Sequence, residues 1–431
     1  MPNQIQVLDP HVADLIAAGE VVERPASVVK ELVENAVDAG AHTLTVEIQR
    51  GGMAMIRVTD DGGGIPADQC QTAFLRHATS KLRTAQDLAA IGTLGFRGEA
   101  LAAIAAVSRV ELFTRTAQCD LGTSLTLEGG QVLSQEPAGC PLGTTLVVRD
   151  LFYNTPARLK FMKRDAAEGA AVFALVQKLA LSHPGVSFQF IRDGKRELMT
   201  PGDGKLSSAL YAVLGRDMAL GFTPVRGEGE DVTVTGFVSL PACCRASRNY
   251  QFFFVNGRFV KSRTMMAALE QAYANQKMVG KFPGCVLHIT TRPNAVDVNV
   301  HPAKTEVKFV SDKRVFDGVY HTVLGGLDAS TQRPAAVITA VKTPAVAPHD
   351  TVTPNQTRLE PVPPARTQEL PPAPAPASRA EPRPEPPAQP AVRPGSRIPV
   401  RTNYLRSALL DRSGSLPLSD FAKPRAAAPA P

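Results

Sequence analysis

Three polar side chains near the start of the chain, Glu31, Asn35 and Asp38, follow one another at the spacing of helical turns. Residues three or four apart lie on the same side of a helix, so these groups would face one place. A carboxylate one turn before a carboxamide could hold a water molecule and a hydrated magnesium ion together. The same spacing suits an ordinary solvated polar face, and the spacing alone leaves both interpretations open.

A second polar group is the run Asp60-Asp-Gly-Gly-Gly-Ile65. Asp60 would stand at the end of a strand as a hydrogen-bond acceptor, and Gly62 and Gly64 would let a flat molecule approach the backbone. Aspartate and glycine also form ordinary turns, so this run is a weak signal when taken alone.

A glycine-rich segment, Gly92-Thr-Leu-Gly-Phe-Arg-Gly98, runs into an apolar stretch at 101–107 that is expected to be a helix. Free backbone N–H groups at a helix N-terminus bind anions, which favours a phosphate site over a plain turn. The sequence contains no Walker A loop, because its three Gly-Lys pairs lack the earlier glycine that this motif requires.

The elements that must position these residues follow from hydrophobic periodicity. Ser27 is expected to cap a helix that ends at Gly40, and the Gly51-Gly52 turn joins two alternating strands into a hairpin. Paired strands that alternate with helices indicate an α+β sandwich. The first part of the chain is expected to contain helices at 10–18, 27–40, 68–82 and 165–182 and strands at 43–49, 54–60, 143–149 and 186–191.

A second α+β unit is expected from about 206 to 327. Its predicted elements are strands at 232–238, 251–257 and 285–290 and a helix at 262–276. Between Pro241 and Cys285, seven Lys and Arg face a single acid, which suits a phosphate backbone and equally a solvated face. The candidate DNA-binding residues there are Arg245, Arg248, Arg258, Lys261 and Arg263.

The last 101 residues differ in composition from the rest, since they hold 22 of the 36 prolines and most of the net charge of +7. Such a sequence cannot form a core and predicts a disordered, extended linker. Its one apolar segment, 403–410, stays undecided between a docking motif and a nascent helix. We therefore expect three parts, residues 1–205, 206–330 and 331–431.

Six cysteines without disulfide or metal-ligand spacing fit a reducing compartment. No apolar run reaches the length of a membrane span, and the N-terminus has no basic flank followed by an apolar core. We expect a cytoplasmic protein with no membrane partner.

Eight motifs occur in an order that resembles the MutL family of DNA mismatch-repair proteins, a branch of the gyrase-, heat-shock-chaperone- and histidine-kinase-like ATPases. The resemblance covers about residues 1 to 327. The motifs are Ile16-Ala-Ala-Gly-Glu-Val-Val-Glu-Arg-Pro25, Lys30-Glu-Leu-Val-Glu-Asn-Ala-Val-Asp-Ala-Gly40, Asp60-Asp-Gly-Gly-Gly-Ile65, His77-Ala-Thr-Ser-Lys81, Gly95-Phe-Arg-Gly-Glu-Ala-Leu101, Leu151-Phe-Tyr-Asn-Thr-Pro-Ala-Arg158, Phe254-Val-Asn-Gly-Arg258 and Val298-Asn-Val-His-Pro-Ala-Lys304.

The resemblance implies a two-layer Bergerat-type ATP-binding sandwich, then a ribosomal-protein-like α+β transducer domain and a disordered Pro-rich tail. It implies ATP and Mg²⁺ as cofactors, with Glu31 as the general base that activates water and Asn35 as the magnesium ligand. Asp60 would accept the adenine amino group. The other nucleotide-binding residues that it implies are Gly62, Gly64, Lys81, Gly95, Phe96, Arg97, Gly98, Thr145 near the base and Lys304 on the γ-phosphate.

The resemblance also implies a slow, magnesium-dependent ATPase that acts as a switch in DNA mismatch repair. ATP would favour a homodimer of N-terminal domains. The implied partners are a MutS-type mismatch sensor, a strand-incision endonuclease, a helicase and DNA bound without sequence preference, and the implied location is the nucleoid. The family's C-terminal dimerisation domain and nuclease motif are not found in this sequence, so we expect no nuclease activity from it.

Two other functions are compatible with parts of the sequence. A DNA-binding matchmaker with a vestigial nucleotide site would not need Glu31, Asn35, Asp60 and Lys304, all of which are present. A sensor histidine kinase shares the ATP-binding fold but needs a phospho-acceptor histidine on a dimerising helix before it, and only ten residues precede His11. The ATPase switch is the leading hypothesis.

Overall fold

The structure is a computed structural model that describes residues 9–81, 95, 98–229, 231–297 and 307–331. All of them lie within one compact unit, Met1–Val341. The linker expected at 331–431 lies outside the described residues except for Thr331, the last residue of a helix, and Phe96, Arg97 and Lys304 also lie outside them.

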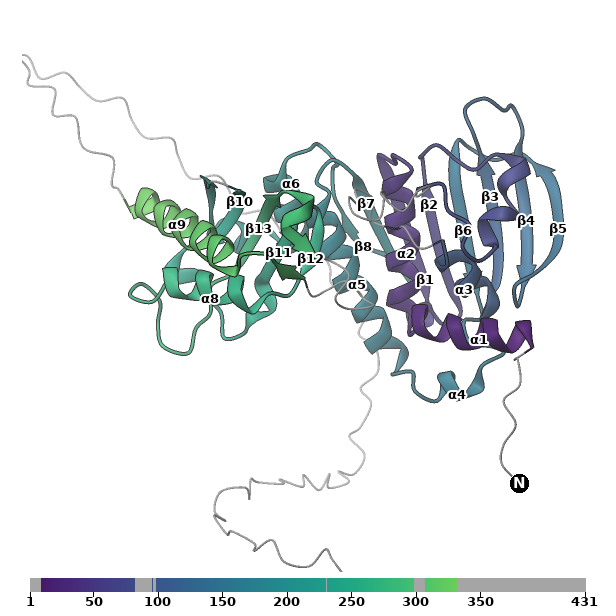
Figure 1. The fold of residues 1–431 in the computed structure, drawn as a ribbon, viewed down its shortest axis with the longest axis horizontal. Coiled ribbons are helices and arrows are strands. Elements are labelled where there is room, and N and C mark those ends of the chain that lie inside the picture. The colour runs from purple at the N-terminus through teal and green to yellow at the C-terminus, as the bar shows by residue number, and fades with distance from the viewer. Residues whose placement is uncertain (1–8, 82–94, 96–97, 230, 298–306, 332–431) are drawn as a thin grey trace, which may run out of the picture. The chain divides into compact units, whose positions relative to one another are not determined.

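An eight-stranded sheet forms the first layer of the N-terminal part (Figure 1). Its strand order is β5-β4-β3-β6-β2-β1-β7-β8, and all neighbours are antiparallel except β1 and β7. The strands are β1 Thr43–Gln49, β2 Met55–Asp60, β3 Arg109–Arg115, β4 Gly122–Glu128, β5 Gln131–Ala138, β6 Gly143–Arg149, β7 Ser187–Arg192 and β8 Lys195–Met199.

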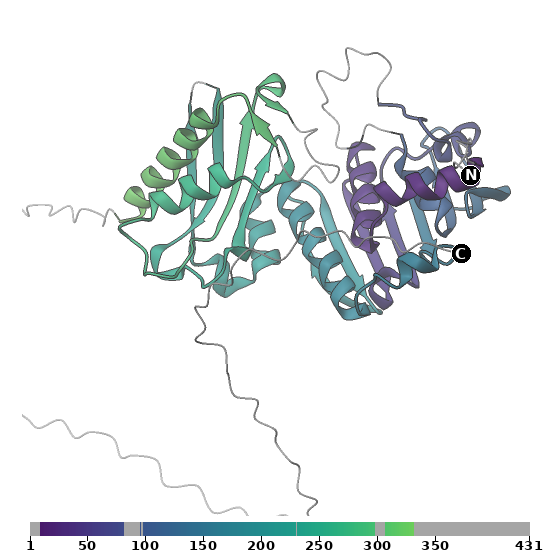
Figure 2. The same ribbon diagram turned by 60° about the horizontal axis from the view of Figure 1, so that its bottom comes forward.

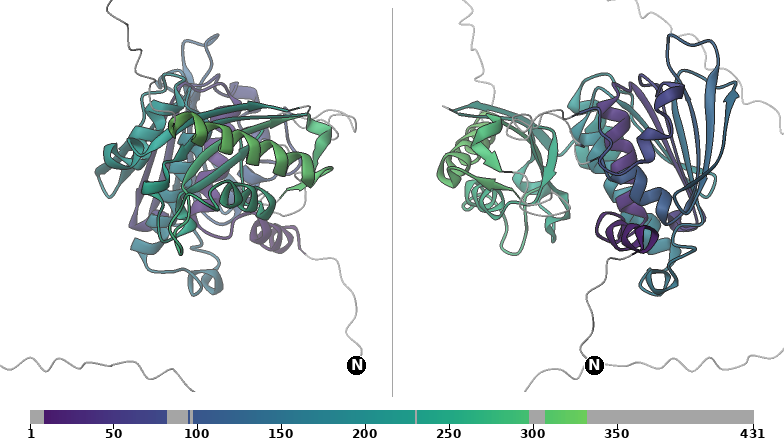
Figure 3. Two further views of the ribbon diagram at one scale, coloured as in Figure 1. Left: turned by 90° about the vertical axis from the view of Figure 1, so that its left-hand side faces the viewer. Right: turned by 45° about the vertical axis from the view of Figure 1, so that its right-hand side comes forward.

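Helices cover one face of this sheet and form the second layer (Figure 3). Helix α2 buries its apolar side chains against the sheet, since Val29 and Val33 belong to the core that contains Leu44 and Val46 of β1. The helical segments are α1 Pro10–Val21, α2 Pro25–Asp38, α3 Ala100–Ala106, α4 Pro156–Leu159 and α5 Asp165–Ser182, with short 3₁₀ turns η1 Arg50–Gly52, η2 Ala67–Gln69 and η3 Thr72–Phe74. The predicted two-layer α+β sandwich is confirmed.

The first turn of α2 differs from the prediction. The helix begins at Pro25, two residues before Ser27, and the preceding Arg24 makes no side-chain capping bond. Proline is well suited to the first helical position, because its missing N–H would be unpaired there in any case. At the other end Gly40 has a φ of 78°, the left-handed conformation predicted for a helix terminus.

The predicted helix at 68–82 is wrong for the part that the structure describes. Only the 3₁₀ turns η2 and η3 form there, and His77 has a φ of 62°, which no α-helix can contain. The buried side chains of Cys70 and Phe74 are four residues apart and imitate a helical stripe.

A five-stranded sheet organises the second α+β unit, in the order β12-β11-β13-β10-β9 (Figure 2). Its neighbours are antiparallel except β11 and β13, and α8 and α9 pack together, with α9 against β9 and β10. The elements are α6 Leu206–Leu214, α7 Arg216–Ala219, β9 Phe222–Glu228, β10 Val232–Ser239, η5 Pro241–Cys243, η6 Arg248–Tyr250, β11 Gln251–Val255, β12 Arg258–Val260, α8 Arg263–Ala272, β13 Cys285–Thr291, η7 Pro293–Ala295, β14 Val296–Asp297, β15 Lys308–Phe309 and α9 Asp312–Thr331.

Strand β11 is buried on both of its faces. Phe253 and Val255 belong to a core with α8 and α9, whereas Phe252 and Phe254 belong to the core of the N-terminal part. The end of α5 contacts this sheet, where the ring of His288 lies 3.1 Å from the Leu181 carbonyl oxygen. The second sheet is therefore packed directly against the end of α5.

Strand β5 lies at one edge of the eight-stranded sheet. Most of its residues are exposed, among them Val132 and Leu133, the latter with 61% of its surface accessible. This strand pairs through its backbone with β4 alone among the described strands.

No helix in the described part of the chain is both long enough and apolar enough to cross a membrane.

Candidate active site

A cavity of about 1590 Å³ opens beside α2. It lies between α2, the end of α1, the glycine run after β2, residues 72–81 and the start of α3, and it reaches β6 at Thr144 and Leu146. Its size exceeds that of ordinary small-ligand pockets, which hold 300–1,000 Å³. A nucleoside triphosphate has room here.

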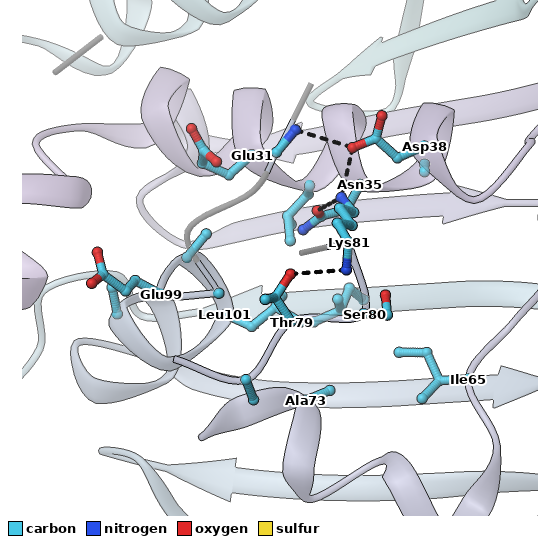
Figure 4. A pocket seen from close by; sticks show the side chains of 18 of the residues that line it. Glu31, Asn35, Asp38, Ile65, Ala73, Thr79, Ser80, Lys81, Glu99 and Leu101 are labelled. Atoms are coloured by element: carbon cyan, nitrogen blue, oxygen red, sulfur yellow. Dashed lines mark hydrogen bonds and ion pairs between the residues drawn. The ribbon is translucent and has the colours of Figure 1, made fainter. Parts of the chain in front are cut away.

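The polar face of α2 lines this cavity. Glu31, Asn35 and Asp38 all contribute to the wall, as their helical spacing predicted. Figure 4 shows Asn35 and Asp38 on one helix with Lys81 between them and the opposite wall. The opposite side of the helix is apolar and buried, which fixes the rotation of α2 about its axis.

Glu31 is bound to the neighbouring Lys30. The Lys30 ammonium lies 3.0 Å from the Glu31 carboxylate and also 3.0 Å from that of Glu34 one turn later. Burial disfavours the charge on Lys30, but the two carboxylates outweigh burial and raise the pKa of Lys30 above its ordinary value. Lys30 therefore stays charged and restrains Glu31 at the cavity wall.

Asp60 stands at the end of β2 on the floor of the cavity. Its carboxylate accepts a 2.9 Å hydrogen bond from the Gly62 N–H and another from the N–H of Thr144. Burial raises the pKa of Asp60, and these two N–H groups only partly offset that effect. An acceptor held by backbone donors in this way can receive an amino group from a ligand.

The structure does not bring Thr145, which was predicted to lie near the base, to the cavity wall. Thr144 lines the cavity and pairs with Asp60 across the sheet, whereas Thr145 pairs with Thr59 and their hydroxyls bond to each other at 3.2 Å. Alternate residues of a strand face opposite sides of the sheet, so Thr145 points away from the pocket.

Gly62 and Gly64 are needed for backbone packing as much as for ligand access. A Cβ atom on Gly62 would lie 3.0 Å from the Ala39 carbonyl oxygen. On Gly64, which has a φ of 70° and lines the cavity, it would overlap the Arg115 carbonyl oxygen. The segment thus lies tightly against the end of α2 and against β3. This packing fixes the position of the backbone that forms the floor of the cavity.

Lys81 and Gly95 meet Asp38 at the far end of α2. The Lys81 ammonium lies 2.6 Å from the Asp38 carboxylate and 2.9 Å from the Asn35 carbonyl oxygen, and the Gly95 N–H donates to Asp38 at 3.0 Å. Lys81 was predicted to bind nucleotide, and the structure brings it into the cavity.

The last glycine of the predicted phosphate segment, Gly98, also lines the cavity and has a φ of 63°. It directly precedes the residues at the N-terminus of α3, whose first turn lies at the cavity wall through Ala100 and Leu101. The roles predicted for Phe96, Arg97 and Lys304 fall on residues outside the described ranges.

The residues present fit a magnesium ion held mainly by a bound nucleotide. Asn35 offers one neutral carbonyl oxygen that already faces a cation, the Lys81 ammonium. Among the described residues no group of three His, Cys, Asp or Glu side chains could hold a metal alone. One protein oxygen, with phosphate and water ligands, is a common environment for Mg²⁺.

The five predicted DNA-binding cations differ in their surroundings. Arg245 and Arg248 precede β11, and Arg248 is engaged with Glu270 at 2.6 Å and with the Phe282 ring at 4.0 Å. Arg258 pairs with the last residue of β11, and Lys261 and Arg263 are exposed beyond it. By this register Arg258 lies at the opposite end of β11 from Arg248, whereas Val260, the residue before Lys261, pairs with Phe253 in the middle of the strand.

Two functional residues escaped the sequence analysis. Lys30 was recognisable from its i,i+4 spacing to Glu34 and from its position next to Glu31, a pattern that places an ammonium on the wall of the site. Thr144 required the strand register, which the sequence alone does not fix.

Comparisons with known proteins agree with this geometry. Residues 23–136 match the family model described as histidine kinase-, DNA gyrase B-, and HSP90-like ATPase. Residues 210–327 match the one described as DNA mismatch repair protein, C-terminal domain.

The curated relatives share one name. The chain is 49% identical over 337 residues to the DNA mismatch repair protein MutL of Symbiobacterium thermophilum, covering 78% of this chain and 53% of that protein. It is 45% identical over 350 residues to MutL of Agathobacter rectalis, covering 81% and 54%. The chain spans about half the length of the curated relatives that it matches.

Solved structures share the fold. The N-terminal domain of a DNA repair protein superposes with a TM-score of 0.64 at 25% identity, over 74% of this chain and 98% of that one. A mutant of the Aquifex aeolicus MutL ATPase domain superposes with a TM-score of 0.50 at 25% identity, over 70% and 99%. The chain belongs to the MutL family of DNA mismatch repair proteins and contains an ATPase domain of the histidine kinase, gyrase B and HSP90 type.

Proposed function

We propose that this chain binds ATP with Mg²⁺ and hydrolyses it slowly, as the switch that couples mismatch recognition to later steps of repair. The observation that carries the proposal is the presence of Glu31 and Asn35, one turn apart on α2, in the wall of a cavity whose floor holds Asp60. This set provides a base, an oxygen ligand and an acceptor for a purine amino group.

Glu31 acts as the general base. Its carboxylate orients the attacking water and accepts its proton as the water oxygen bonds to the γ-phosphorus and the bond to the β-γ bridging oxygen breaks. Lys30 holds Glu31 at the wall and keeps the carboxylate from turning into the helix surface. A positioned base of this kind contributes roughly 10²–10⁴-fold to the rate.

Asn35 would hold a magnesium ion, which supplies charge neutralisation for the phosphates when bound. Because the amide is neutral, it leaves the positive charge of the ion for the nucleotide. Asp60 accepts the adenine amino group, with Thr144 beside it, and so selects adenine over guanine, which carries an oxo group at that position. Gly95 and Gly98 offer backbone N–H groups to the phosphates.

The wider function rests on the family relationship. ATP binding favours a homodimer of N-terminal domains, and hydrolysis reverses it. The partners are a MutS-type mismatch sensor, DNA bound at the exposed cations near β12, and incision and unwinding factors. Such a role places the protein inside the cell, at the nucleoid.

The test is ATP turnover and ATP binding by Glu31→Ala. We expect turnover to fall by roughly 10²–10⁴-fold while the nucleotide is retained, because Glu31 acts on water and not on the adenine or ribose. Glu111→Ala is the control, since this carboxylate lies on β3 and pairs with Arg149 outside the cavity. Unchanged turnover in Glu31→Ala would remove Glu31 from this role.

The rival function, a DNA-binding matchmaker with a vestigial nucleotide site, gives a different result in the same experiment. Wild-type turnover would then already be at background, and Glu31→Ala would change neither turnover nor DNA binding.

A further inference from the structure

Lys81 binds the same oxygen that is assigned to the metal. Its ammonium lies 2.9 Å from the Asn35 carbonyl oxygen and 2.6 Å from the Asp38 carboxylate (Figure 4). The side chain of Asp38 is 8% exposed and that of Lys81 20% exposed, so the contact lies inside the cavity wall. The other lysine of this wall, Lys30, contacts Glu31 and Glu34 instead.

The backbone closes over this contact. Gly95 donates its N–H to the same Asp38 carboxylate, and a Cβ atom at Gly95 would lie 3.2 Å from the Lys81 ammonium and 3.4 Å from the Asn35 oxygen. Gly95, the middle glycine of the predicted phosphate segment, thus lies directly on the ion pair. A substitution of Lys81 therefore also changes the surroundings that hold Gly95 in place.

We propose that Lys81 occupies the place of the divalent cation in the nucleotide-free protein and excludes metal from Asn35 until nucleotide arrives. The inference rests on the proposed function, because it takes Asn35 as the metal ligand. If Lys81 formed only an ordinary surface ion pair, its ammonium would contact the Asp38 carboxylate alone. Here the ammonium also lies on a neutral amide oxygen, which is the contact that a cation substitute requires.

The two cations cannot share Asn35. Magnesium binds oxygen at 2.0–2.1 Å in a strict octahedron, and an ammonium on the same oxygen would lie against it with like charge. Removal of Lys81 would leave Asp38 and Asn35 as a partly buried oxygen pair with no ammonium between them.

A triphosphate offers Lys81 another partner. Its negative charge attracts the ammonium away from Asn35, so metal and nucleotide enter together and neither is held alone. Departure of Lys81 also takes one donor from Asp38, the carboxylate that accepts the N–H of Gly95 in the predicted phosphate segment, and so weakens the hold on Gly95.

The experiment is a Mn²⁺ titration of the full chain without nucleotide, read from the electron paramagnetic resonance signal of free Mn²⁺. Lys81→Met should gain one saturable site per chain, at least about tenfold tighter than any site in the wild type. Lys81→Arg should bind as weakly as the wild type, because it keeps the positive charge. Lys178→Met is the control and should gain no site, because this half-buried lysine lies over the Phe259 ring and not on Asn35.

Equal Mn²⁺ binding by wild type and Lys81→Met would overturn the proposal. So would a gain in Lys81→Met that survives the additional Asn35→Ala change. If Lys81→Met unfolds, Lys81→Gln removes the charge with less loss of hydrogen bonding and carries the same expectation. The readout needs no ATP, so it stays separate from the turnover of Glu31→Ala, which tests the proposed function.

Discussion

The adjacent carboxyl groups of Asp60 and Asp61 have opposite surroundings. Burial raises the pKa of Asp60. For Asp61 burial is slight and acts in the same direction, but the N–H groups of Thr43 and His42, at 2.8 and 2.7 Å, outweigh it and lower the pKa. The charge on Asp60 therefore costs folding free energy, whereas the charge on Asp61 stabilises the fold.

Asp60→Asn should raise the free energy of unfolding at neutral pH by roughly 1 kcal/mol, because the amide oxygen keeps the N–H bonds without the buried charge. A carboxyl whose folded-state pKa is raised destabilises only where it is ionised. The gain should therefore shrink as the pH falls through that pKa, as measured by urea unfolding at a series of pH values. The same variant should bind ATP about tenfold more weakly, since a charged acceptor is lost.

Asp61→Asn is the control of opposite sign. Its folded-state pKa is lowered, so its stabilisation is present above the unfolded value of 3.8 and disappears as the pH falls through the folded-state pKa. The variant should lose stability at neutral pH and keep ATP binding. A shift of both variants in the same direction would contradict the burial argument for Asp60.

At this scale the sequence predicts residue types better than residue positions. Glu31 and Asn35 could be placed in the wall because a helix repeats every 3.6 residues and its apolar side is unambiguous. Thr144 could not be told from Thr145, because one step along a strand reverses the face and nothing in Gly-Thr-Thr marks which threonine faces inward.

Among the elements, the segment Leu151–Arg158 fastens the helices around the cavity. Arg158 donates to the Val22 carbonyl oxygen at 2.5 Å, just beyond α1, and its guanidinium lies 5.7 Å from the centre of the Phe152 ring. A Cβ atom on Gly19 would overlap the end of Arg158. The motif thus anchors α1, whose end lines the cavity.

Arg158→Ala should destabilise the protein by roughly 1.5–3 kcal/mol, the range for a hydrogen bond to a charged group, and weaken ATP binding by loosening α1. Thermal unfolding and ATP titration measure the two effects. Arg164→Ala is the control, because that side chain is exposed next to the start of α5.

Gly19→Ala, made in the wild type and in Arg158→Ala, tests whether Arg158 lies against Gly19. In the wild type the added methyl group displaces Arg158 and should destabilise the protein. In Arg158→Ala the obstruction is gone, so the same change should stabilise α1 by about 0.5–1 kcal/mol, the ordinary difference between glycine and alanine in a helix. Equal effects in both backgrounds would show that Arg158 does not lie against Gly19.

Helices and strands could be predicted where a hydrophobic pattern continues over the whole element. Helix α5 and strand β1 agree with the predictions at every boundary, since each buries one unbroken face. The segment at 68–82 failed, because the left-handed backbone of His77 follows from the walls around it and leaves no mark in the sequence. Strand β5 offered no alternation to detect, because most of its residues are exposed.

For the whole molecule, the different surroundings of the basic residues decide which of them DNA binding should depend on. Lys261→Glu should weaken binding and reduce the salt slope by about one phosphate contact, because Lys261 is exposed at the corner between β12 and α8. Arg248→Glu should change the slope less, since Glu270 already offsets the Arg248 charge. Fluorescence anisotropy of labelled DNA at several salt concentrations measures both. An unaltered salt slope in Lys261→Glu would mean that Lys261 is an ordinary solvated side chain that does not contact DNA.

The overall architecture could be predicted as a class but not as a topology. Paired strands and helices indicated α+β, whereas the parallel pairings of β1 with β7 and of β11 with β13 join segments far apart in the chain. Such pairings depend on the packing of whole layers, which local patterns do not encode.

The open side of β5 has a practical consequence for handling the protein. A strand whose outer edge pairs with no other strand in the described part of the chain, and whose apolar side chains such as Leu133 face water, is a template with which another chain can pair. In concentrated samples we expect chains to associate through backbone hydrogen bonds between β5 strands, independently of ATP. Leu133→Lys would place a positive charge on this edge strand and oppose pairing between chains. The change should help to keep crystallisation or scattering samples monodisperse.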